Sequence, residues 1–263
     1  MIVHYQPIVE IDTGSVMRVE ALLRTEDGAH GLSTAAFIAQ AESNGLIREV
    51  TSHIAGLALA DAKEYRFGLP LSINISTINL TERDFVERFL KVVAEFDRED
   101  MPLTFEMQDG IQAALDGAGL EAMQRLQGAG VRFSIDGFGQ DLSQFSHIEL
   151  ERIGIVELKI HSDLGAKLSV AANRVAVESI VALAERLGLD LVAKNVESAE
   201  HLASVRAVGA RFAQGYHIAQ PMSALDLAAW IVGRPRLART RKADPELRKP
   251  ATGLENALRF FRR

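Results

Sequence analysis

Short apolar runs of strand length alternate with helical patterns along most of this chain, and this alternation limits the folds open to it. The runs lie at 71–75, 103–107, 131–135, 155–160 and 189–193, and each precedes a segment with helical periodicity. Before them, residues 2–11 and 16–24 have the pattern of two strands joined by the turn Asp12-Thr13-Gly14. The pattern therefore predicts parallel strands connected by crossover helices, after an opening hairpin.

We expect these elements to close into an α/β fold, a TIM-like (β/α)8 barrel with an N-terminal β-hairpin, over residues 1–233. A doubly wound open sheet is the alternative. Between the hairpin and the first run, a predicted helical stripe carries Phe37, Ile38, Ala41 and Leu46, and a further helical stretch extends to about Tyr65.

Composition and charge narrow the function classes. The chain has no Cys, which excludes thiolate nucleophiles and Cys-ligated zinc, and it has no apolar run of membrane-spanning length, so we expect a soluble, cytoplasmic protein. Residues 234–263 carry a net charge of +7, which leaves −13 on the rest of the chain. An acidic body argues against a nucleic-acid polymer as ligand.

The basic segment 234–263 is rich in Arg and Pro and is predicted to be a flexible extension. Leu254, Leu258 and Phe261 have the spacing of one face of a short helix. That face could dock on a partner, and the basic segment is the only part of the chain for which we expect contact with an anionic membrane.

Six polar residues stand at or near the ends of the predicted strands, where the barrel would bring them to one mouth. They are Glu20, Asn74, Glu106, Asp136, Lys159 and Lys194. The first four supply three carboxylates and an amide oxygen, which are hard ligands suited to Mg²⁺, Mn²⁺ or Ca²⁺.

Ordered motifs around these residues resemble the EAL domain family. The matching motifs are Tyr5-Gln6-Pro7-Ile8, Glu20-Ala21-Leu22 with Leu23-Arg24, Asn74-Ile75-Ser76, Glu106, Asp136 with Phe138-Gly139, Leu158-Lys159-Ile160, Val196-Glu197 and Gln214-Gly215-Tyr216. The resemblance covers roughly residues 3 to 221. It implies a barrel whose mouth binds cyclic di-GMP and, in active members, hydrolyses it to linear pGpG with two divalent cations.

The resemblance also implies roles for single residues. The first metal ion would be held by Glu20, Asn74, Glu106 and Asp136. The ligand would be bound by Arg24, Leu22, Asp136, Gln214 and Glu197, with Arg24 on a phosphate. Lys159 would position the attacking water or neutralise developing charge, and Glu197 would be a vestigial member of the catalytic group.

Two departures from the family pattern affect the second metal ion. Active members carry two consecutive aspartates where this chain has Asp136-Gly137, and an acid where it has Lys194. The local formal charge changes by +3, and the ammonium group of Lys194 would repel a divalent cation or stand in its place. The mouth would then bind one Mg²⁺ or Mn²⁺ ion at the first site, where Ca²⁺ would also be suitable, or it would bind no metal ion at all.

These departures favour a degenerate EAL domain that acts as a cyclic di-GMP receptor with little or no hydrolytic activity. It would pass its state to a protein partner or a second copy of the chain. The alternatives are a weak phosphodiesterase that gives pGpG and a nucleotide-independent interaction scaffold.

Overall fold

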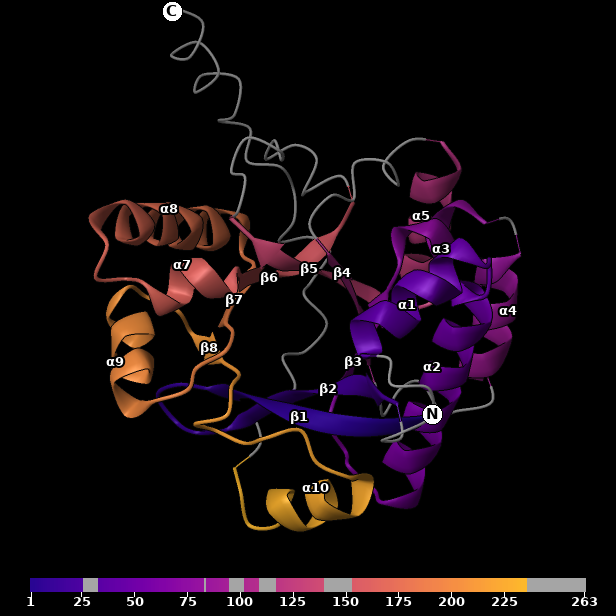
Figure 1. The fold of residues 1–263 in the computed structure, drawn as a ribbon, viewed down its shortest axis with the longest axis horizontal. Helices are drawn as coiled ribbons and strands as arrows, with labels where there is room; N and C mark the ends of the chain where they lie inside the picture. The colour runs from indigo at the N-terminus through magenta and orange to yellow at the C-terminus, as the bar shows by residue number, and fades with distance from the viewer. Residues whose placement is uncertain (26–32, 83, 95–101, 109–116, 140–152, 236–263) are drawn as a thin grey trace, which may run out of the picture.

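A closed barrel of eight strands forms the body of the protein in the computed structural model (Figure 1). The structure describes residues 1–25, 33–82, 84–94, 102–108, 117–139 and 153–235. The strands are β1 (Ile2–Glu10), β2 (Val16–Arg24), β3 (Leu71–Ile75), β4 (Leu103–Gln108), β5 (Arg132–Phe138), β6 (Ile155–Ile160), β7 (Asp190–Ala193) and β8 (Phe212–Ala213).

The strands lie side by side in chain order, and β1 differs from the others in direction. β2 to β8 are parallel to one another, whereas β1 is antiparallel to both β2 and β8. The predicted barrel and its opening hairpin are therefore confirmed, and the open-sheet alternative is excluded. Closure depends on β8, which pairs through two residues with the end of β1 (Val9↔Ala213 and Glu10↔Phe212).

Helices surround the barrel on its outer side (Figure 1). They are α1 (Thr34–Ser43), α2 (Ile47–Glu64), α3 (Thr77–Thr81), α4 (Phe85–Ala94), α5 (Ala118–Gly128), α7 (Ser162–Ala166), α8 (Ala171–Leu187), α9 (Ala199–Ala207) and α10 (Ala224–Ile231). None of the described helices is both long enough and apolar enough to cross a bilayer.

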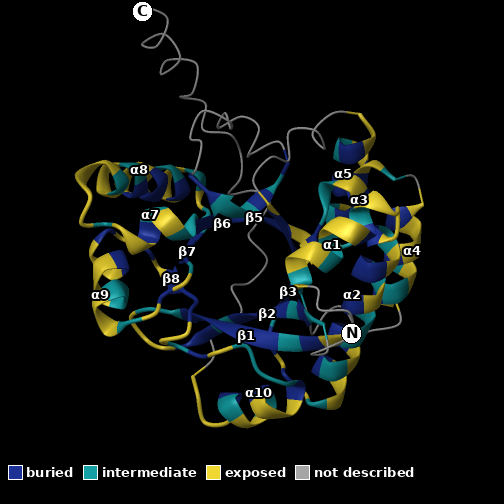
Figure 2. Ribbon diagram, in the orientation of Figure 1, coloured by how far each residue is buried: buried dark blue, intermediate teal, exposed yellow. Residues whose placement is uncertain are grey.

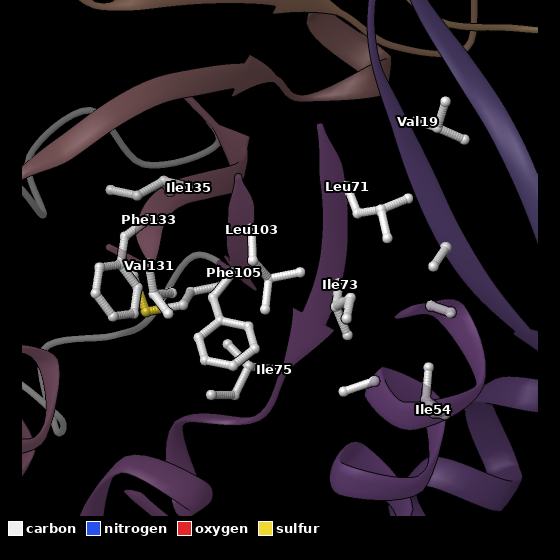
Figure 3. Packing of buried hydrophobic residues seen from close by; sticks show 14 of the residues in the cluster. Val19, Ile54, Leu71, Ile73, Ile75, Leu103, Phe105, Val131, Phe133 and Ile135 are labelled. Atoms are coloured by element: carbon white, nitrogen blue, oxygen red, sulfur yellow. The ribbon is translucent and has the colours of Figure 1, made fainter. Parts of the chain in front are cut away.

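The outward-facing strand residues build the main hydrophobic core between barrel and helices. Figure 2 shows the strands largely buried and the outer faces of the helices exposed. In Figure 3, Phe105 and Phe133 lie close together, with ring centroids 6.1 Å apart. Phe105 also packs on Phe89 of α4 at 4.6 Å, which joins this helix to β4. Burial of such rings is the main source of stability for this layer.

One sequence expectation about this layer is wrong. The sequence predicts Leu46 on the same helical stripe as Phe37, Ile38 and Ala41, but Leu46 is 53% exposed. The helix α1 ends at Ser43, and Leu46 is the N-cap residue of α2. The change of chain direction between the two helices interrupts the helical period, so the stripe stops at Ala41.

The described chain ends at Pro235, whose carbonyl accepts a hydrogen bond from the backbone N–H of Val16 at 2.9 Å. Arg234 lies over the ring of Trp230, with the guanidinium carbon 3.9 Å from the ring centroid. The rest of the basic segment, including Leu254, Leu258 and Phe261, lies outside the described residues, so its flexibility and its contacts stay predictions.

The inner face of the barrel is polar in two successive layers. Because side chains two residues apart on a strand point to the same face, each of five strands contributes one residue to each layer. The lower layer contains Arg18, Ser72, Thr104, Ser134 and Glu157, and the upper layer contains Glu20, Asn74, Glu106, Asp136 and Lys159.

Candidate functional site

A lysine at the centre of the upper layer joins strands that are not neighbours. Lys159 on β6 donates to Glu20 Oε2 on β2 at 2.8 Å and to Glu106 Oε2 on β4 at 2.5 Å. A side chain can make both contacts only through the barrel interior, and Lys159 has no exposed surface. The predicted strand-end residues therefore meet inside the mouth, as expected for a barrel.

Glu20 accepts hydrogen bonds at both of its carboxylate oxygens. Asn74 Nδ2 donates to Oε1 at 2.9 Å, and Gln214 Nε2 donates to Oε2 at 2.8 Å, beside the bond from Lys159. Gln214 is itself oriented by Gln6, which accepts from the same Nε2 at 3.3 Å. Charge-assisted bonds of this kind fix the carboxylate in one orientation.

Burial and charge act differently on the two glutamates. Burial alone would raise the pKa of Glu20, but the adjacent Lys159 ammonium group lowers that pKa to about 2. Burial, followed by repulsion from Glu20, raises the pKa of Glu106 to about 7 despite its shorter contact with Lys159. Glu106 is entirely buried, so loss of hydration outweighs the attraction of one ammonium group shared between two carboxylates.

Lys159 remains a cation in this setting. Burial would lower the pKa of its ammonium group, but the negative charges of Glu106 and Glu20 raise that pKa above the usual value. The lysine is thus an internal cation that holds two carboxylates together.

A second ion pair lies at the edge of the same layer. Lys194 Nζ donates to both carboxylate oxygens of Asp136, at 2.6 Å and 2.7 Å. This pair is more open than the first, because the side chains are 24% and 12% exposed. Lys194 replaces an acid of the family pattern. It binds Asp136, which is one of the residues predicted to hold the first metal ion.

The backbone has left-handed conformations at Gly137 and at Asn195, the residue that follows Lys194. Gly137 has φ +75° and lies at an irregularity in the pairing of β5 with β6. Asn195 has φ +53°, and asparagine tolerates this region better than most residues with a side chain. This explains how a residue with a side chain is accommodated at position 195.

The loop after β7 is joined to the residues after β8 by backbone contacts. Gln214 N–H donates to the Ala193 carbonyl at 2.9 Å, and Val196 N–H donates to the Gln214 carbonyl at 3.0 Å. At Gly215 a Cβ atom would lie 2.2 Å from both the nitrogen and the oxygen of Val196. Only glycine permits this approach, which positions the Lys194 loop beside Gln214.

Three predicted ligand-binding residues do not belong to this hydrogen-bonded network. Arg24 is half-buried at the end of β2, where one guanidinium nitrogen donates to the Leu23 carbonyl at 2.9 Å. Leu22 is half-buried on the same strand, and Glu197 is exposed in the loop after β7. Their roles toward a ligand stay predictions.

Sequence reasoning missed two features of the barrel interior. Gln6 had no assigned role, although it faces Glu20 across the β1–β2 pair and contacts Gln214. The lower layer was also missed: Arg18 forms a buried ion pair with Glu157 and donates to Thr104 at 2.8 Å. The signal was present as charged residues two positions before Glu20 and Lys159.

A separate recess of about 510 Å³ lies away from the mouth, against α9. Its lining is mostly apolar and includes none of the predicted site residues: Ile11, Ala199, Leu202, Ala203, Arg206 and Ala207. Arg206 forms an ion pair with Asp12 at 2.7 Å. Convergent polar groups define the mouth, rather than this recess, as the candidate functional site.

The carboxylates of the mouth have the oxygen donors that divalent cations prefer, but the described residues do not arrange them around one point. Among these residues, no three His, Cys, Asp or Glu side chains form a group able to hold a metal ion. Within the same part of the chain, Glu106 Oε1 is a buried oxygen without a hydrogen-bond partner. Of the predicted ligand set, Glu20 and Glu106 bind Lys159, Asp136 binds Lys194, and Asn74 donates to Glu20.

These features define a class of protein: an eight-stranded barrel with one antiparallel strand and a mouth lined by carboxylates and lysines. The family model described as EAL domain matches residues 1–221, and the chain belongs to the EAL domain family.

Relatives and solved structures agree with this assignment. The chain is 30% identical over 237 residues to the bifunctional diguanylate cyclase/cyclic di-GMP phosphodiesterase MucR of Pseudomonas aeruginosa, covering 88% of this chain and 34% of MucR. The PaMucR phosphodiesterase in its c-di-GMP complex superimposes with a TM-score of 0.77 at 27% identity, covering 86% and 93%. The structure of the EAL enzyme Bd1971 with cAMP and cyclic-di-GMP bound superimposes with a TM-score of 0.78 at 26% sequence identity. This match covers 87% of the present chain and 64% of the Bd1971 chain. The chain therefore spans only about a third of MucR.

Proposed function

We propose that this chain is a cyclic di-GMP receptor, a degenerate EAL domain with little or no hydrolytic activity that signals to a protein partner or a second copy of itself. Support for the ligand comes from the PaMucR and Bd1971 structures, which contain cyclic di-GMP. Support for the loss of hydrolysis comes from Gly137 and Lys194, which stand where the family pattern has acids.

The observation that carries this proposal is the contact of Lys194 Nζ with both oxygens of Asp136. Two-metal hydrolases hold two ions about 4 Å apart to activate water and stabilise the leaving oxygen. An ammonium group 4 Å from a divalent ion would repel it by about 8 kcal/mol at an effective dielectric constant near 20. The second ion would therefore be excluded from this mouth.

The ligand-binding side of the site is retained in sequence. Arg24 would bind a phosphate, because its planar group presents five donors, of which one is engaged by the Leu23 carbonyl in the described part of the chain. Leu22, Gln214 and Glu197 would line the bound nucleotide. Lys159 would contribute a fixed positive charge beneath it.

A weak phosphodiesterase is the second candidate, favoured by the unpartnered oxygen of Glu106 and by the persistence of the first-metal residues. Such an enzyme would use one Mg²⁺ or Mn²⁺ held by Glu20, Asn74, Glu106 and Asp136, with Lys194 in place of the second ion. Its turnover would be low, because a monovalent group cannot activate water as a metal ion does.

Binding and hydrolysis are separated by two measurements on the purified protein. Calorimetry with cyclic di-GMP should show saturable binding, and its absence would favour a nucleotide-independent scaffold. Chromatography of long incubations with Mg²⁺ or Mn²⁺ should show no pGpG above the level of a protein-free sample. Rapid, metal-dependent release of pGpG would contradict the receptor proposal.

Restoration of the two acids provides a sharper test. We expect Gly137→Asp with Lys194→Glu to raise turnover by roughly two to three orders of magnitude, because it restores the electrostatic environment of the second ion. Among the described residues, a Cβ atom at position 137 would meet His161 Cδ2 alone, at 3.7 Å, so these residues leave space for the side chain. The left-handed backbone adds a strain of about 1–2 kcal/mol, which should lower stability.

The matched control is Lys91→Glu, the same charge reversal on the exposed face of α4. It should leave turnover at the level of the unmodified protein. Failure of the double variant to gain activity, when circular dichroism shows that it is folded, would mean that the missing acids are not what disables hydrolysis.

A further inference from the structure

The pairing of Asp136 with Lys194 affects the first metal site as well as the second. Asp136 offers two carboxylate oxygens, and one ammonium group binds both of them. A metal ion bound to the remaining lone pairs of this carboxylate would lie within a few Å of the Lys194 ammonium group, which would repel it. The lysine is therefore placed to compete with any cation for Asp136.

The two buried glutamates are occupied in a similar way. Glu20 accepts from Asn74, Gln214 and Lys159, which use both of its oxygens. Asn74 presents its amide nitrogen to Glu20, whereas metal binding would require the amide oxygen. Glu106 Oε2 accepts a hydrogen bond from Lys159. Its other oxygen, Oε1, is buried without a hydrogen-bond partner in the described part of the chain. Mg²⁺ retains several water ligands and Ca²⁺ takes six to eight oxygens, so one buried oxygen alone does not make a site for either ion.

The charges of the mouth lead to the same result. Three carboxylates, of Glu20, Glu106 and Asp136, are paired with the two ammonium groups of Lys159 and Lys194. The internal cations leave at most a single negative charge in this set, so little attraction for a divalent ion remains. Lys159 is fully buried and cannot reach solvent, whereas Lys194 is partly exposed at the mouth.

Lys194 also has hydrogen-bonding capacity that Asp136 does not use. An ammonium group carries three N–H donors, and two of them point to the oxygens of Asp136. The third has no partner among the described residues, and the side chain is 24% exposed. Asp136 thus holds a cation in a fixed position with one donor available to a phosphate oxygen.

We infer that this mouth excludes divalent cations altogether and that Lys194, held by Asp136, binds a phosphate of the nucleotide in their place. The inference rests on the proposed receptor function and adds to it a metal-free mode of binding. Asp136 changes its role from metal ligand to positioning residue for Lys194.

The first test measures metal binding without nucleotide. Mn²⁺ is titrated into the purified protein and followed by electron paramagnetic resonance of the free ion. We expect no stoichiometric binding to the unmodified protein, and tighter binding by about tenfold or more to Lys194→Met, in which Asp136 is released. Equal, stoichiometric Mn²⁺ binding by both proteins would overturn the exclusion of cations.

The second test measures nucleotide binding by calorimetry with excess EDTA and with excess Mg²⁺. The affinity of the unmodified protein should agree within about twofold between the two conditions. Lys194→Met should lose about tenfold or more in EDTA, as expected for one hydrogen bond to a charged group, and Lys194→Arg should recover most of that loss. A requirement for Mg²⁺ in the unmodified protein would overturn the inference.

Two control variants keep the tests interpretable. Lys91→Met removes an exposed lysine from α4 and should change neither measurement. If the unmodified protein binds no cyclic di-GMP in either condition, the proposed function fails, and so does the phosphate-binding role of Lys194. The Mn²⁺ titration then still decides whether the mouth excludes cations, so the two failures are distinguishable.

Discussion

The two polar layers inside the barrel use the same strands and nearly the same chemistry, but only the upper one has a partly exposed ion pair at its edge. In the lower layer Arg18 on β2 pairs with Glu157 on β6; in the upper layer the polarity is reversed, with Glu20 on β2 and Lys159 on β6. The lower pair is closed by Thr104 and Ser134, which contact the guanidinium and carboxylate groups at 2.8 Å. The upper layer has additional carboxylates and reaches the surface at Lys194 and Asp136.

The difference teaches that charge inside a barrel does not by itself indicate a functional site. The lower ion pair has equal and opposite charges and almost no exposed surface, with side chains 7% and 0% exposed. The upper layer together with Lys194 has one carboxylate more than it has ammonium groups, and the Asp136–Lys194 pair remains partly exposed. Excess charge with access to solvent separates a binding site from a structural ion pair.

The largest expected effect concerns the lower layer. Arg18→Met would leave Glu157 buried without its cation, and we expect the free energy of unfolding to fall by about 3–5 kcal/mol. Urea denaturation followed by circular dichroism measures this change. The double variant Arg18→Met with Glu157→Leu should return most of the loss, because neither charge remains. A single variant within about 1 kcal/mol of the unmodified protein would show that the pair is not structural.

An intermediate effect on the free energy of unfolding is expected at Gln214, which contacts Glu20 of the upper layer. Gln214→Leu removes a hydrogen bond to the Glu20 carboxylate and one to Gln6, and should cost about 1.5–3 kcal/mol of unfolding free energy. The control Gln124→Leu, on the exposed face of α5, should remain within about 0.5 kcal/mol. Equal effects of the two variants would mean that Gln214 does not hold the mouth together.

The smallest effect on stability is expected at the edge of the upper layer. Lys194→Met breaks a partly exposed ion pair, which contributes less than about 1 kcal/mol to folding. The same denaturation series measures it beside Arg18→Met. A loss as large as that of Arg18→Met would place Lys194 among the structural charges of the barrel and would remove the contrast between the two layers.

The barrel itself could be predicted because its signals are local. Apolar runs at β3, β4 and β6 are long enough to separate strands from helices, and the turn at Asp12-Thr13-Gly14 marks the hairpin. β8 was not predicted, because two residues are too few to show a strand period. It is formed by pairing with β1 and β7, which lie far away in the sequence.

The candidate site was predictable in its members but not in its contacts. Strand-end positions placed Glu20, Glu106 and Lys159 at one mouth, and the structure brings them within hydrogen-bonding distance. The pairing of Lys194 with Asp136 could not be read from either residue alone, because it depends on how the loop after β7 approaches β5 across β6. The sequence shows that Lys194 departs from the family motif, but it does not show that Lys194 pairs with Asp136.

The close approach of Gly215 to Val196 has a consequence for how this protein would respond to random mutation. Any larger residue at position 215 would separate two backbone segments, and Lys194 and Gln214 would move with them. A saturation screen for nucleotide binding would rank this glycine with the most sensitive positions in the chain. Glycine has no functional group that could contact the nucleotide. The screen would therefore detect the steric limit on side-chain size at this position.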